Sequence, residues 1–252
     1  MRFAVLGSGS RGNATVVESA STCVMIDCGF SMRETEKRLG QLAREAKDVN
    51  AILLTHEHSD HIKGVGALAR KYGIPVWATR GTVTNGLLGQ VPELKHCDTE
   101  HGFAIGDLEV TSFPVPHDAK EPCQFVFSDG DVRFAILTDT GSTTVHIEQM
   151  LSSCDAMMLE CNHDRAMLQA GSYPQGLKDR VAGPFGHLSN DQAAALLTRV
   201  DTSRLRHIVA AHLSEKNNAP HLASAALSEA LNCEEEWVGL ATQDTCLQWR
   251  TV

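Results

Sequence analysis

AILLTHEHSDHIKG, residues 51–64, places three histidines, a glutamate and an aspartate within six residues, directly behind an apolar run. Neutral imidazole is a good ligand for divalent metals, and carboxylate oxygen compensates charge at sites that also hold water. His56 and His58 are two residues apart, so in an extended segment they face the same side and can bind one ion. Asp60 and His61 lie at the turn into a predicted helix, where they can reach a second ion. The stretch therefore predicts a metal site at the end of a strand.

The composition favours a chain that folds without a metal to hold it together. The protein has 252 residues, of which 42% are apolar, and a chain of this length buries about three-quarters of its unfolded surface. We therefore expect a single domain over residues 1–252, in which a metal serves chemistry rather than folding. The eight cysteines are scattered without a CxxC pair, which indicates reduced thiols. Residues 1–13 have neither the pattern of a signal peptide nor that of a membrane span, so a cytoplasmic protein without a membrane partner is predicted. No oligomeric state is implied.

The charge of the chain is acidic. Its formal net charge is −9 and its pI is about 5.7. This balance argues against a protein that coats nucleic acid through diffuse positive charge. It still allows a local basic strip beside one site, so the composition weakens a nuclease interpretation without excluding it.

Apolar strand-like runs alternate with amphipathic helical runs along the whole chain, as in a layered α/β protein. Strands are predicted over residues 2–6, 15–19, 23–27, 51–55, 76–79, 108–114, 124–128, 133–137, 156–159 and 205–211. Helices are predicted after the capping boxes that begin at Ser31 and Ser189, over Ile62–Tyr72, and over Pro220–Leu231. The segment from Gln169 to Phe185 is rich in Gly, Pro and charge and is predicted to be a surface loop.

Several predicted strands are followed at once by a residue that can bind a metal. These residues are His56, His117, Asp139, Glu160 and His212. Loops at strand ends leave the packed interior while the strands fix their positions. We therefore expect these side chains to gather at one edge of the sheets.

THEHSDH, residues 55–61, resembles the T-H-x-H-x-D-H signature of the metallo-β-lactamase superfamily. A histidine, an aspartate and a late histidine then follow strands in that family's order, at His117, Asp139 and His212. The resemblance runs from residue 1 to about residue 215. It implies an α/β fold, an αββα four-layer sandwich with two mixed β-sheets flanked by helices. The resemblance assigns His56, His58 and His117 to one metal, Asp60, His61 and His212 to a second, and Asp139 as the bridge.

A pair of ions at this site would carry hydrolytic chemistry. Two divalent ions roughly 3.5–4 Å apart can hold a water as hydroxide between them and polarise the oxygen of the bond being broken. Aspartate suits the bridging position because two nearby cations need an anion between them. Ligation rich in imidazole favours zinc, with manganese or iron as alternatives. The resemblance thus implies a dinuclear hydrolase that uses a metal-bridging hydroxide.

GSGSRGN, residues 7–13, resembles the SGSxGN loop of nuclease-type members of the family. The resemblance implies that Ser8, Ser10 and Asn13 bind substrate, and the backbone N–H groups of such a loop can cradle a phosphate. A plain glycine turn between two strands is the alternative interpretation.

GHLSN, residues 186–190, resembles the GHxS/T segment of ribonuclease Z and related phosphodiesterases. The resemblance implies that His187 assists the leaving group. His187 and Asp60 are therefore the expected catalytic residues, Asp60 as part of the metal motif. A buried structural histidine is the alternative. LECNHD, residues 159–164, resembles a segment of YycJ-type exonucleases, in which Glu160 or His163 would support His187 from behind; a purely structural role for both is the alternative.

Together these segments favour a metal-dependent phosphodiesterase or nuclease, exonuclease-like, that acts on nucleic acid or another phosphodiester. Two alternatives remain open. A small-molecule hydrolase of the same fold, acting on a thioester, lactone or cyclic phosphodiester, agrees with the acidic charge and shares the metal motif. A non-catalytic module that uses the metals as a structural element fits less well, because structural sites close their coordination sphere.

Overall fold

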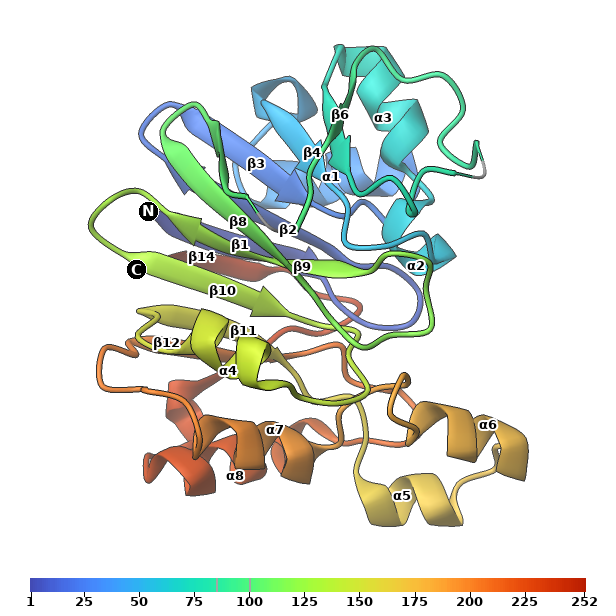
Figure 1. Ribbon diagram of the computed structural model, residues 1–252, viewed down its shortest axis with the longest axis vertical. Helices are drawn as coiled ribbons and strands as arrows, with labels where there is room; N and C mark the ends of the chain where they lie inside the picture. Colours follow the sequence, from blue (N-terminus) through green and yellow to red (C-terminus); the bar gives the residue numbers. More distant parts are fainter. Residues whose placement is uncertain (85, 100) are drawn as a thin grey trace.

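The computed structural model describes residues 1–84, 86–99 and 101–252. Two β-sheets pack face to face, and helices cover the outer face of each sheet (Figure 1). The fold is therefore the αββα sandwich that the sequence predicts.

The first sheet has seven strands in the order β14-β1-β2-β3-β4-β5-β6. Strands β1, β2 and β3 form an antiparallel meander, and β4, β5 and β6 continue the sheet parallel to β3. Their bounds are Arg2–Gly7 (β1), Ala14–Ser19 (β2), Thr22–Ile26 (β3), Ala51–Leu53 (β4), Val76–Ala78 (β5), Leu94–His96 (β6) and Leu247–Thr251 (β14).

The second sheet repeats this arrangement, with seven strands in the order β13-β12-β11-β10-β9-β8-β7. Here β8, β9 and β10 form the antiparallel meander, and β11, β12 and β13 continue parallel to β10. Their bounds are Phe103–Ile105 (β7), Leu108–Pro114 (β8), Cys123–Ser128 (β9), Arg133–Leu137 (β10), Ala156–Glu160 (β11), His207–Ala211 (β12) and Val238–Leu240 (β13).

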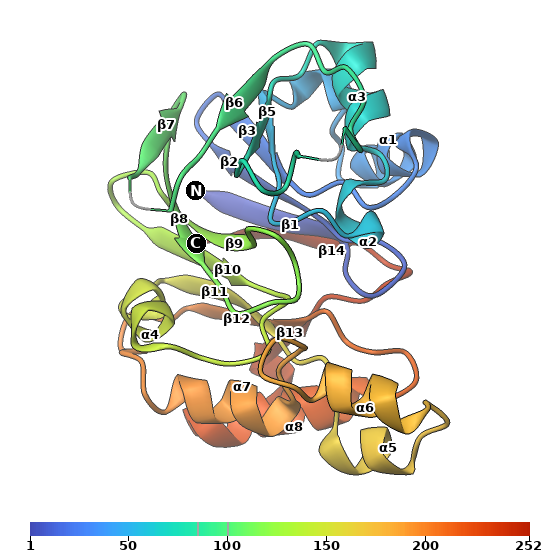
Figure 2. The same cartoon turned by 45° about the vertical axis from the view of Figure 1, so that its right-hand side comes forward.

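The helices fall into two covering layers and a group at one end. Figure 2 shows α1 and α3 over the first sheet, α4, α7 and α8 over the second, and α5 and α6 beside α7 and α8. Their bounds are Met32–Gln41 (α1), Ser59–Ile62 (α2), Val65–Tyr72 (α3), Val145–Leu151 (α4), Arg165–Ala170 (α5), Gln175–Val181 (α6), Asn190–Leu197 (α7) and Pro220–Leu231 (α8). Two short 3₁₀ helices cover Ala46–Asp48 and Glu235–Trp237.

Strand alternation divides the apolar side chains among three buried layers. On β1, Phe3 and Val5 face the second sheet, while Ala4 and Leu6 pack with the helices of the first. Phe3 stacks on Phe134 of β10, with the ring centroids 4.2 Å apart. Burial of each such ring stabilises the fold by about 1.5–3 kcal/mol. The contact joins the two sheets near the beginnings of β1 and β10.

The ten predicted strands are present within a few residues, and β6, β7, β13 and β14 are additional. The predicted caps are present too: Ser31 and Ser189 each accept a hydrogen bond from the backbone N–H of the third helical residue. The capping box is complete only at Ser189. At α1 the Glu34 carboxylate accepts a hydrogen bond from Arg38 Nε at 2.8 Å instead, so that half of the prediction was wrong.

Two helical predictions need correction. The helix predicted over Ile62–Tyr72 is interrupted, because α2 ends at Ile62 and α3 begins at Val65. Gly64 between them donates its N–H to Cys28 O at 2.7 Å, and a Cβ there would lie 2.1 Å from Phe30 O. A tertiary contact thus breaks the periodic run. The segment predicted as a loop between Gln169 and Phe185 contains α6.

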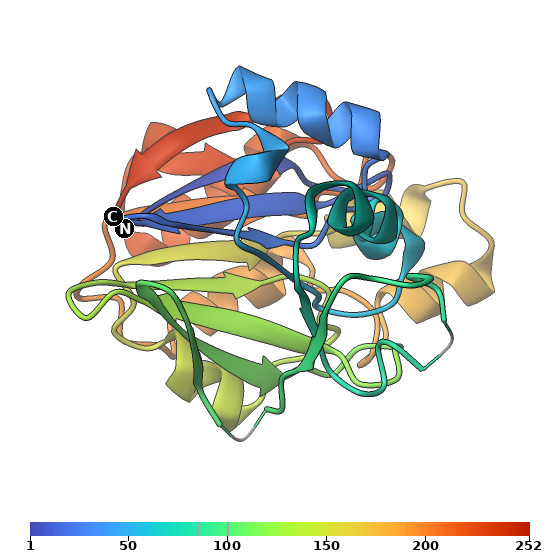
Figure 3. The ribbon, with the colours of Figure 1, turned by 90° about the horizontal axis from the view of Figure 1, so that it is seen from above.

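The two ends of the chain lie next to each other (Figure 3). Val252 donates its N–H to Met1 O at 3.1 Å, beside the pairing of β1 with β14. Within the described ranges, none of the helices combines the length and apolar character that crossing a lipid bilayer requires.

Candidate metal centre

The turn after β4 is held by Asp27, which follows β3. Its carboxylate accepts hydrogen bonds from Thr55 N at 2.9 Å and from Thr55 Oγ1 at 2.8 Å. The chain then reaches α2, for which His58 is the N-cap residue. Gly29 makes this close approach possible, because a Cβ there would lie 1.6 Å from Asp60 O. The strand ends therefore place the histidines of this turn at one edge of the sandwich.

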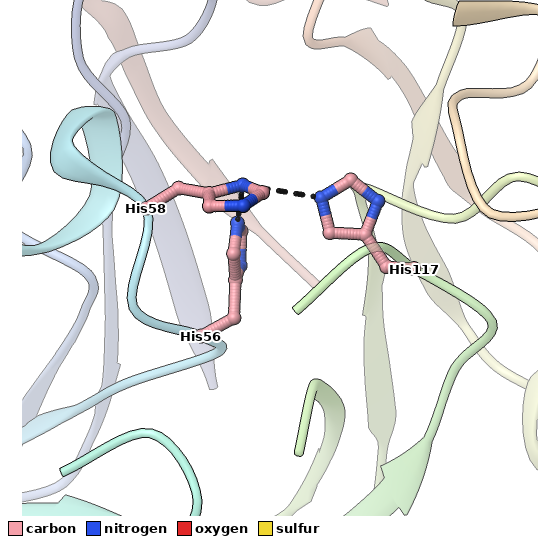
Figure 4. Close-up of side chains that lie close together, drawn as sticks. All are labelled: His56, His58 and His117. Carbon is pink, nitrogen blue, oxygen red and sulfur yellow. Dashed lines mark hydrogen bonds between the residues drawn. The ribbon is translucent and has the colours of Figure 1, made fainter. Parts of the chain in front are cut away.

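Three imidazoles converge at this edge, and we name them the imidazole group: His56, His58 and His117 (Figure 4). His58 Nδ1 lies 2.9 Å from His56 Nε2 and 3.3 Å from His117 Nε2. His117 Nδ1 lies 3.0 Å from the carbonyl oxygen of Gly186, so it carries a proton and leaves Nε2 with a lone pair. Burial holds the pKa values of His56 and His117 below the usual range. His56 Nε2, His58 Nδ1 and His117 Nε2 thus face one point, as the ligands of a single ion would.

A second set lies beside it, the mixed group of Asp60, His61 and His212. Asp60 Oδ2 lies 3.5 Å from His61 Nε2 and 3.8 Å from His212 Nε2. His61 Nδ1 contacts Asp27 Oδ2 at 2.7 Å, which leaves Nε2 to face Asp60. Each group therefore offers three ligand atoms within 4.8 Å of one another.

Asp139 lies between the two groups. Its Oδ2 is 3.2 Å from His61 Nε2 of the mixed group, and its Oδ1 is 3.9 Å from His117 Nε2 of the imidazole group. Burial opposes ionisation of Asp139, but the surrounding imidazoles, His212 first among them, hold its pKa well below the usual range. Asp139 is thus an anion placed to contact ions in both groups.

Among the described residues, Asp139 Oδ2 and His212 Nε2 are buried and form no hydrogen bond of acceptable geometry, although His61 Nε2 lies 3.2 Å from Asp139 Oδ2. Buried polar atoms in native proteins nearly always have one. An imidazole nitrogen and a carboxylate oxygen without partners, among other nitrogen and oxygen donors, are the donor set that divalent metals prefer. The residues present therefore fit a pair of metal ions.

The backbone at the strand ends is strained. Asp27, Asp139 and His212 have φ values of 58°, 52° and 55°, in the left-handed region. Each such residue costs about 1–3 kcal/mol, and strain of this kind is kept where a side chain must be aimed. All three follow strands that have parallel neighbours, β3, β10 and β12. The strain thus coincides with the residues that converge.

Glu160, at the end of β11, connects His187 with the mixed group. Its Oε1 lies 2.8 Å from His187 Nδ1 and 3.0 Å from His212 Nδ1. Burial would raise the pKa of Glu160, but the neighbouring imidazoles lower it to about 2. Burial likewise opposes protonation of His187, yet Glu160 raises the pKa of His187 above its usual value. His163 is also buried, its Nδ1 has no hydrogen-bond partner, and burial lowers its pKa to about 4. Of the two residues predicted to support His187, only Glu160 is in hydrogen-bond contact with it among the described residues.

The loop of residues 7–13, which we name the glycine loop, lies directly behind the mixed group. Ser8 Oγ accepts a hydrogen bond from His212 N at 2.9 Å and donates one to Asn13 Oδ1 at 3.1 Å. Asn13 Nδ2 lies 3.1 Å from His61 Nε2. Both side chains are buried, whereas Ser10 is exposed and lines the pocket. Substrate binding by the three residues stays a prediction, and the contacts of Ser8 and Asn13 are with metal-centre residues.

A cavity of about 230 Å³ opens over the centre. His58, Asp139, His187 and His212 form its floor, and Tyr173, Leu177 and Arg180 belong to its wall. Neither this wall nor the role of Asp27 was predicted from the sequence. Asp27 had a usable signal, since it ends an apolar strand as the predicted ligands do.

The chain matches the model of the family described as "Beta-lactamase superfamily domain" over residues 22–212. It is 39% identical to exodeoxyribonuclease YycJ of Bacillus anthracis, over 95% of this chain and 92% of that protein. It is 36% identical to exodeoxyribonuclease WalJ of Streptococcus pneumoniae, over 95% of this chain and 91% of that protein.

Solved structures share the fold. The metallo-β-lactamase fold protein YhfI of Bacillus subtilis superposes with a TM-score of 0.74 at 15% identity, over 97% of this chain and 98% of that one. The short form of human tRNase Z superposes with a TM-score of 0.68 at 17% identity, over 98% of each chain.

Proposed function

Because this chain belongs to the metallo-β-lactamase superfamily, we propose that it is a metal-dependent phosphodiesterase that removes nucleotides from nucleic acid as an exonuclease. The chain is a metal-dependent hydrolase of that superfamily, and two relatives that cover most of it are exodeoxyribonucleases. The observation that carries the proposal is the convergence of two ligand groups on Asp139, with unpartnered ligand atoms at their junction. Because both relatives are named exodeoxyribonucleases, we propose DNA as the nucleic acid substrate.

The imidazole group would hold one divalent ion, the mixed group a second, and Asp139 would bridge them. Such ions would polarise the phosphoryl oxygen, activate water and neutralise the charge that develops. We propose zinc, because imidazole supplies most of the ligand atoms, with manganese or iron as alternatives. Asp60 serves the reaction through its place in the mixed group.

His187 would donate a proton to the departing oxygen. Glu160 accepts from Nδ1 at 2.8 Å, which fixes the ring and leaves Nε2 as its second proton-bearing nitrogen. Glu160 raises the pKa of His187 above its usual value, which favours the protonated form that a general acid requires. His187 also lines the cavity beside Asp139 and His212.

The glycine loop would serve both the metal centre and the substrate. Ser10 lines the cavity and would contact the phosphodiester. Ser8 and Asn13 would act on the substrate through the positions of His212 and His61, which they contact. His163 would support the segment that follows His187, since its carbonyl oxygen accepts from Asn190 N at 2.9 Å.

We also propose one domain over residues 1–252 in the cytoplasm. Pairing of β1 with β14 in one sheet supports the single domain. The eight free cysteines, six of them buried, agree with a reducing compartment.

Elemental analysis of the purified protein, coupled to hydrolysis assays across added metals, tests the function. The substrates are a labelled oligonucleotide, a chromogenic phosphodiester and lactoylglutathione. We expect about two equivalents of metal and cleavage of the oligonucleotide from an end. Metal-loaded protein that hydrolyses lactoylglutathione and neither phosphodiester would replace this function with the small-molecule hydrolase.

A further inference from the structure

One wall of the cavity comes from a helix that contributes nothing to the core. α6 buries none of its residues, although a helix this short depends on packing for its stability. Leu177, Arg180 and Val181 are spaced i, i+3 and i+4, so they share one face of the helix. All three line the cavity over the metal centre. The face of α6 that could pack is therefore the one turned to the ligand.

Arg180 supplies positive charge to a cavity whose other charged side chains are acidic or imidazole. Among the described residues that line the cavity, it is the only lysine or arginine. Its Nε and Nη2 each lie 2.5 Å from Asp118 Oδ2, and Asp118 Oδ1 lies 3.5 Å from His117 Nε2. A guanidinium presents paired donors that match phosphate oxygens. The ion pair with Asp118 holds this guanidinium next to the imidazole group, and because Asp118 already contacts Nε and Nη2, a phosphate would bind chiefly through Nη1.

Tyr173 gives the same wall an aromatic ring. The residue is half-buried and lines the cavity, and Lys216 Nζ lies 5.6 Å from the ring centroid. Nucleic acid bases stack on aromatic rings without regard to sequence, and a nearby cation strengthens such a platform. Tyr173, Leu177 and Arg180 thus present an aromatic, an apolar and a cationic surface along one segment.

The size of the cavity limits what can enter. Its volume of about 230 Å³ is below the roughly 300–1,000 Å³ of pockets for drug-sized ligands. A cavity this small can take in one unit of a polymer at a time rather than a longer stretch of it. A strand would therefore enter by its end.

We propose that Tyr173, Leu177 and Arg180 form a nucleotide wall that binds the terminal nucleotide of a single-stranded nucleic acid end. Arg180 binds a backbone phosphate, Tyr173 stacks on the base, and Leu177 packs against the sugar. Asp118 is a positioning residue that orients Arg180. The proposal rests on the phosphodiesterase function and adds to it the form of the substrate.

Two measurements test the wall. The first is equilibrium binding of a short fluorescein-labelled single strand to chelator-treated protein, followed by anisotropy. The second is steady-state hydrolysis of the same strand and of methyl p-nitrophenyl phosphate, which has no base. We expect Arg180→Ala and Tyr173→Ala each to weaken binding and raise KM for the strand about ten-fold, with kcat changed less than about three-fold. Hydrolysis of the small diester should fall less than hydrolysis of the strand in both variants, because the diester has no base or sugar for the wall to bind.

Matched variants separate the wall from a general loss of structure. Arg199 is a suitable control, because its Nε also lies 2.5 Å from a carboxylate, that of Glu148, yet it does not line the cavity. Arg199→Ala and Tyr173→Phe should bind the strand normally, and Arg180→Lys should recover part of the binding.

The outcomes keep the two proposals apart. Unchanged strand binding in both Arg180→Ala and Tyr173→Ala overturns the wall, whatever the turnover. Equal losses on the strand and on the small diester overturn it too, because they would place the effect in the metal centre. If the unchanged protein binds the strand but hydrolyses neither diester, the phosphodiesterase function falls, and with it the substrate assigned to the wall.

Discussion

The imidazole group and the mixed group lie side by side but are held in different ways. Behind the imidazole group, two of the three outer ring nitrogens meet neutral oxygens. His56 Nδ1 lies 3.0 Å from Thr55 Oγ1, and His117 Nδ1 lies 3.0 Å from the carbonyl of Gly186. The third member, His58, has a side chain that is 32% exposed. His56 and His117 are buried, so His58 is the member through which solvent reaches the group, and the outer ring nitrogens of His56 and His117 face neutral oxygens rather than carboxylates.

Behind the mixed group the outer ring nitrogens meet carboxylates. Asp27 contacts His61 at 2.7 Å, and Glu160 contacts His212 at 3.0 Å. Both imidazoles are buried. A carboxylate behind a metal-binding imidazole orients the ring and raises its basicity. The difference indicates one tight metal site and one that exchanges more readily, built from the same types of residue.

Replacement of Asp139 should affect both groups at once, because this residue lies between them. We expect Asp139→Ala to lose metal from both groups and to lower phosphodiester turnover on the order of 10³-fold. Elemental analysis and kinetics measure the two effects. Asp131→Ala, an exposed aspartate on a loop of the second sheet, is the control. Full metal content in Asp139→Ala would contradict the bridging role.

His187 shares Glu160 with the mixed group but is expected to hold no metal. His187→Ala should lower turnover about 10²-fold through loss of the proton donor, while both metals remain. Metal content by elemental analysis, beside kcat for an oligonucleotide, checks this. If His187→Ala keeps full activity, His187 is not the proton donor. If it loses a metal, the ring belongs to the mixed group.

Asp27→Asn tests what the carboxylate behind His61 contributes. The amide keeps an oxygen for Thr55 but removes the charge, so we expect the metal of the mixed group to bind about 10- to 100-fold more weakly. The metal of the imidazole group should be affected much less. Competition with a chromogenic chelator resolves the two affinities, and Asp107→Asn, on the exposed turn before β8, serves as the control. An equal loss in both groups would remove the distinction between them.

The number of protons released on metal binding is the smallest of the expected effects, and it distinguishes the two groups directly. Burial opposes protonation of His61 and His212, but neighbouring carboxylates, Asp139 first, raise the pKa of His61 well above its usual value and that of His212 to about 10. Burial lowers the pKa values of His56 and His117. At pH 7 metal must therefore displace protons from the mixed group, whose affinity should fall as the pH is lowered, and almost none from the imidazole group.

Calorimetry of metal binding in buffers of different ionisation enthalpy counts these protons. We expect one phase that releases between one and two protons and another that releases close to none. Two phases with the same release would show that the carboxylates do not separate the groups.

Much of the centre could be predicted because its residues follow apolar strands. His56, His117, Asp139 and His212 each stand at such a position, and the structure brings them together. Asp27 stands at one as well, but a strand end does not reveal whether a carboxylate will face a metal or the back of an imidazole. That choice depends on the neighbouring strand.

The parts that escaped prediction lack a local signal. α6 buries no residue, so it has no apolar stripe that would mark it as a helix. β14 pairs with β1 from the other end of the chain, and no short window contains both strands. Gly64 interrupts a periodic run because it packs against Phe30 O and Cys28 O. In each case a distant partner decides the local structure.

The two sheets share one topology, an antiparallel meander continued by parallel strands, and their equivalent positions carry related residues. Asp27 follows β3 and Asp139 follows β10, the strands at which each meander turns parallel, and both residues are left-handed. The same backbone turn at the same point of each sheet therefore serves two purposes: in the second sheet it aims Asp139 at the place where the ligand groups meet, and in the first it aims Asp27 at the back of His61.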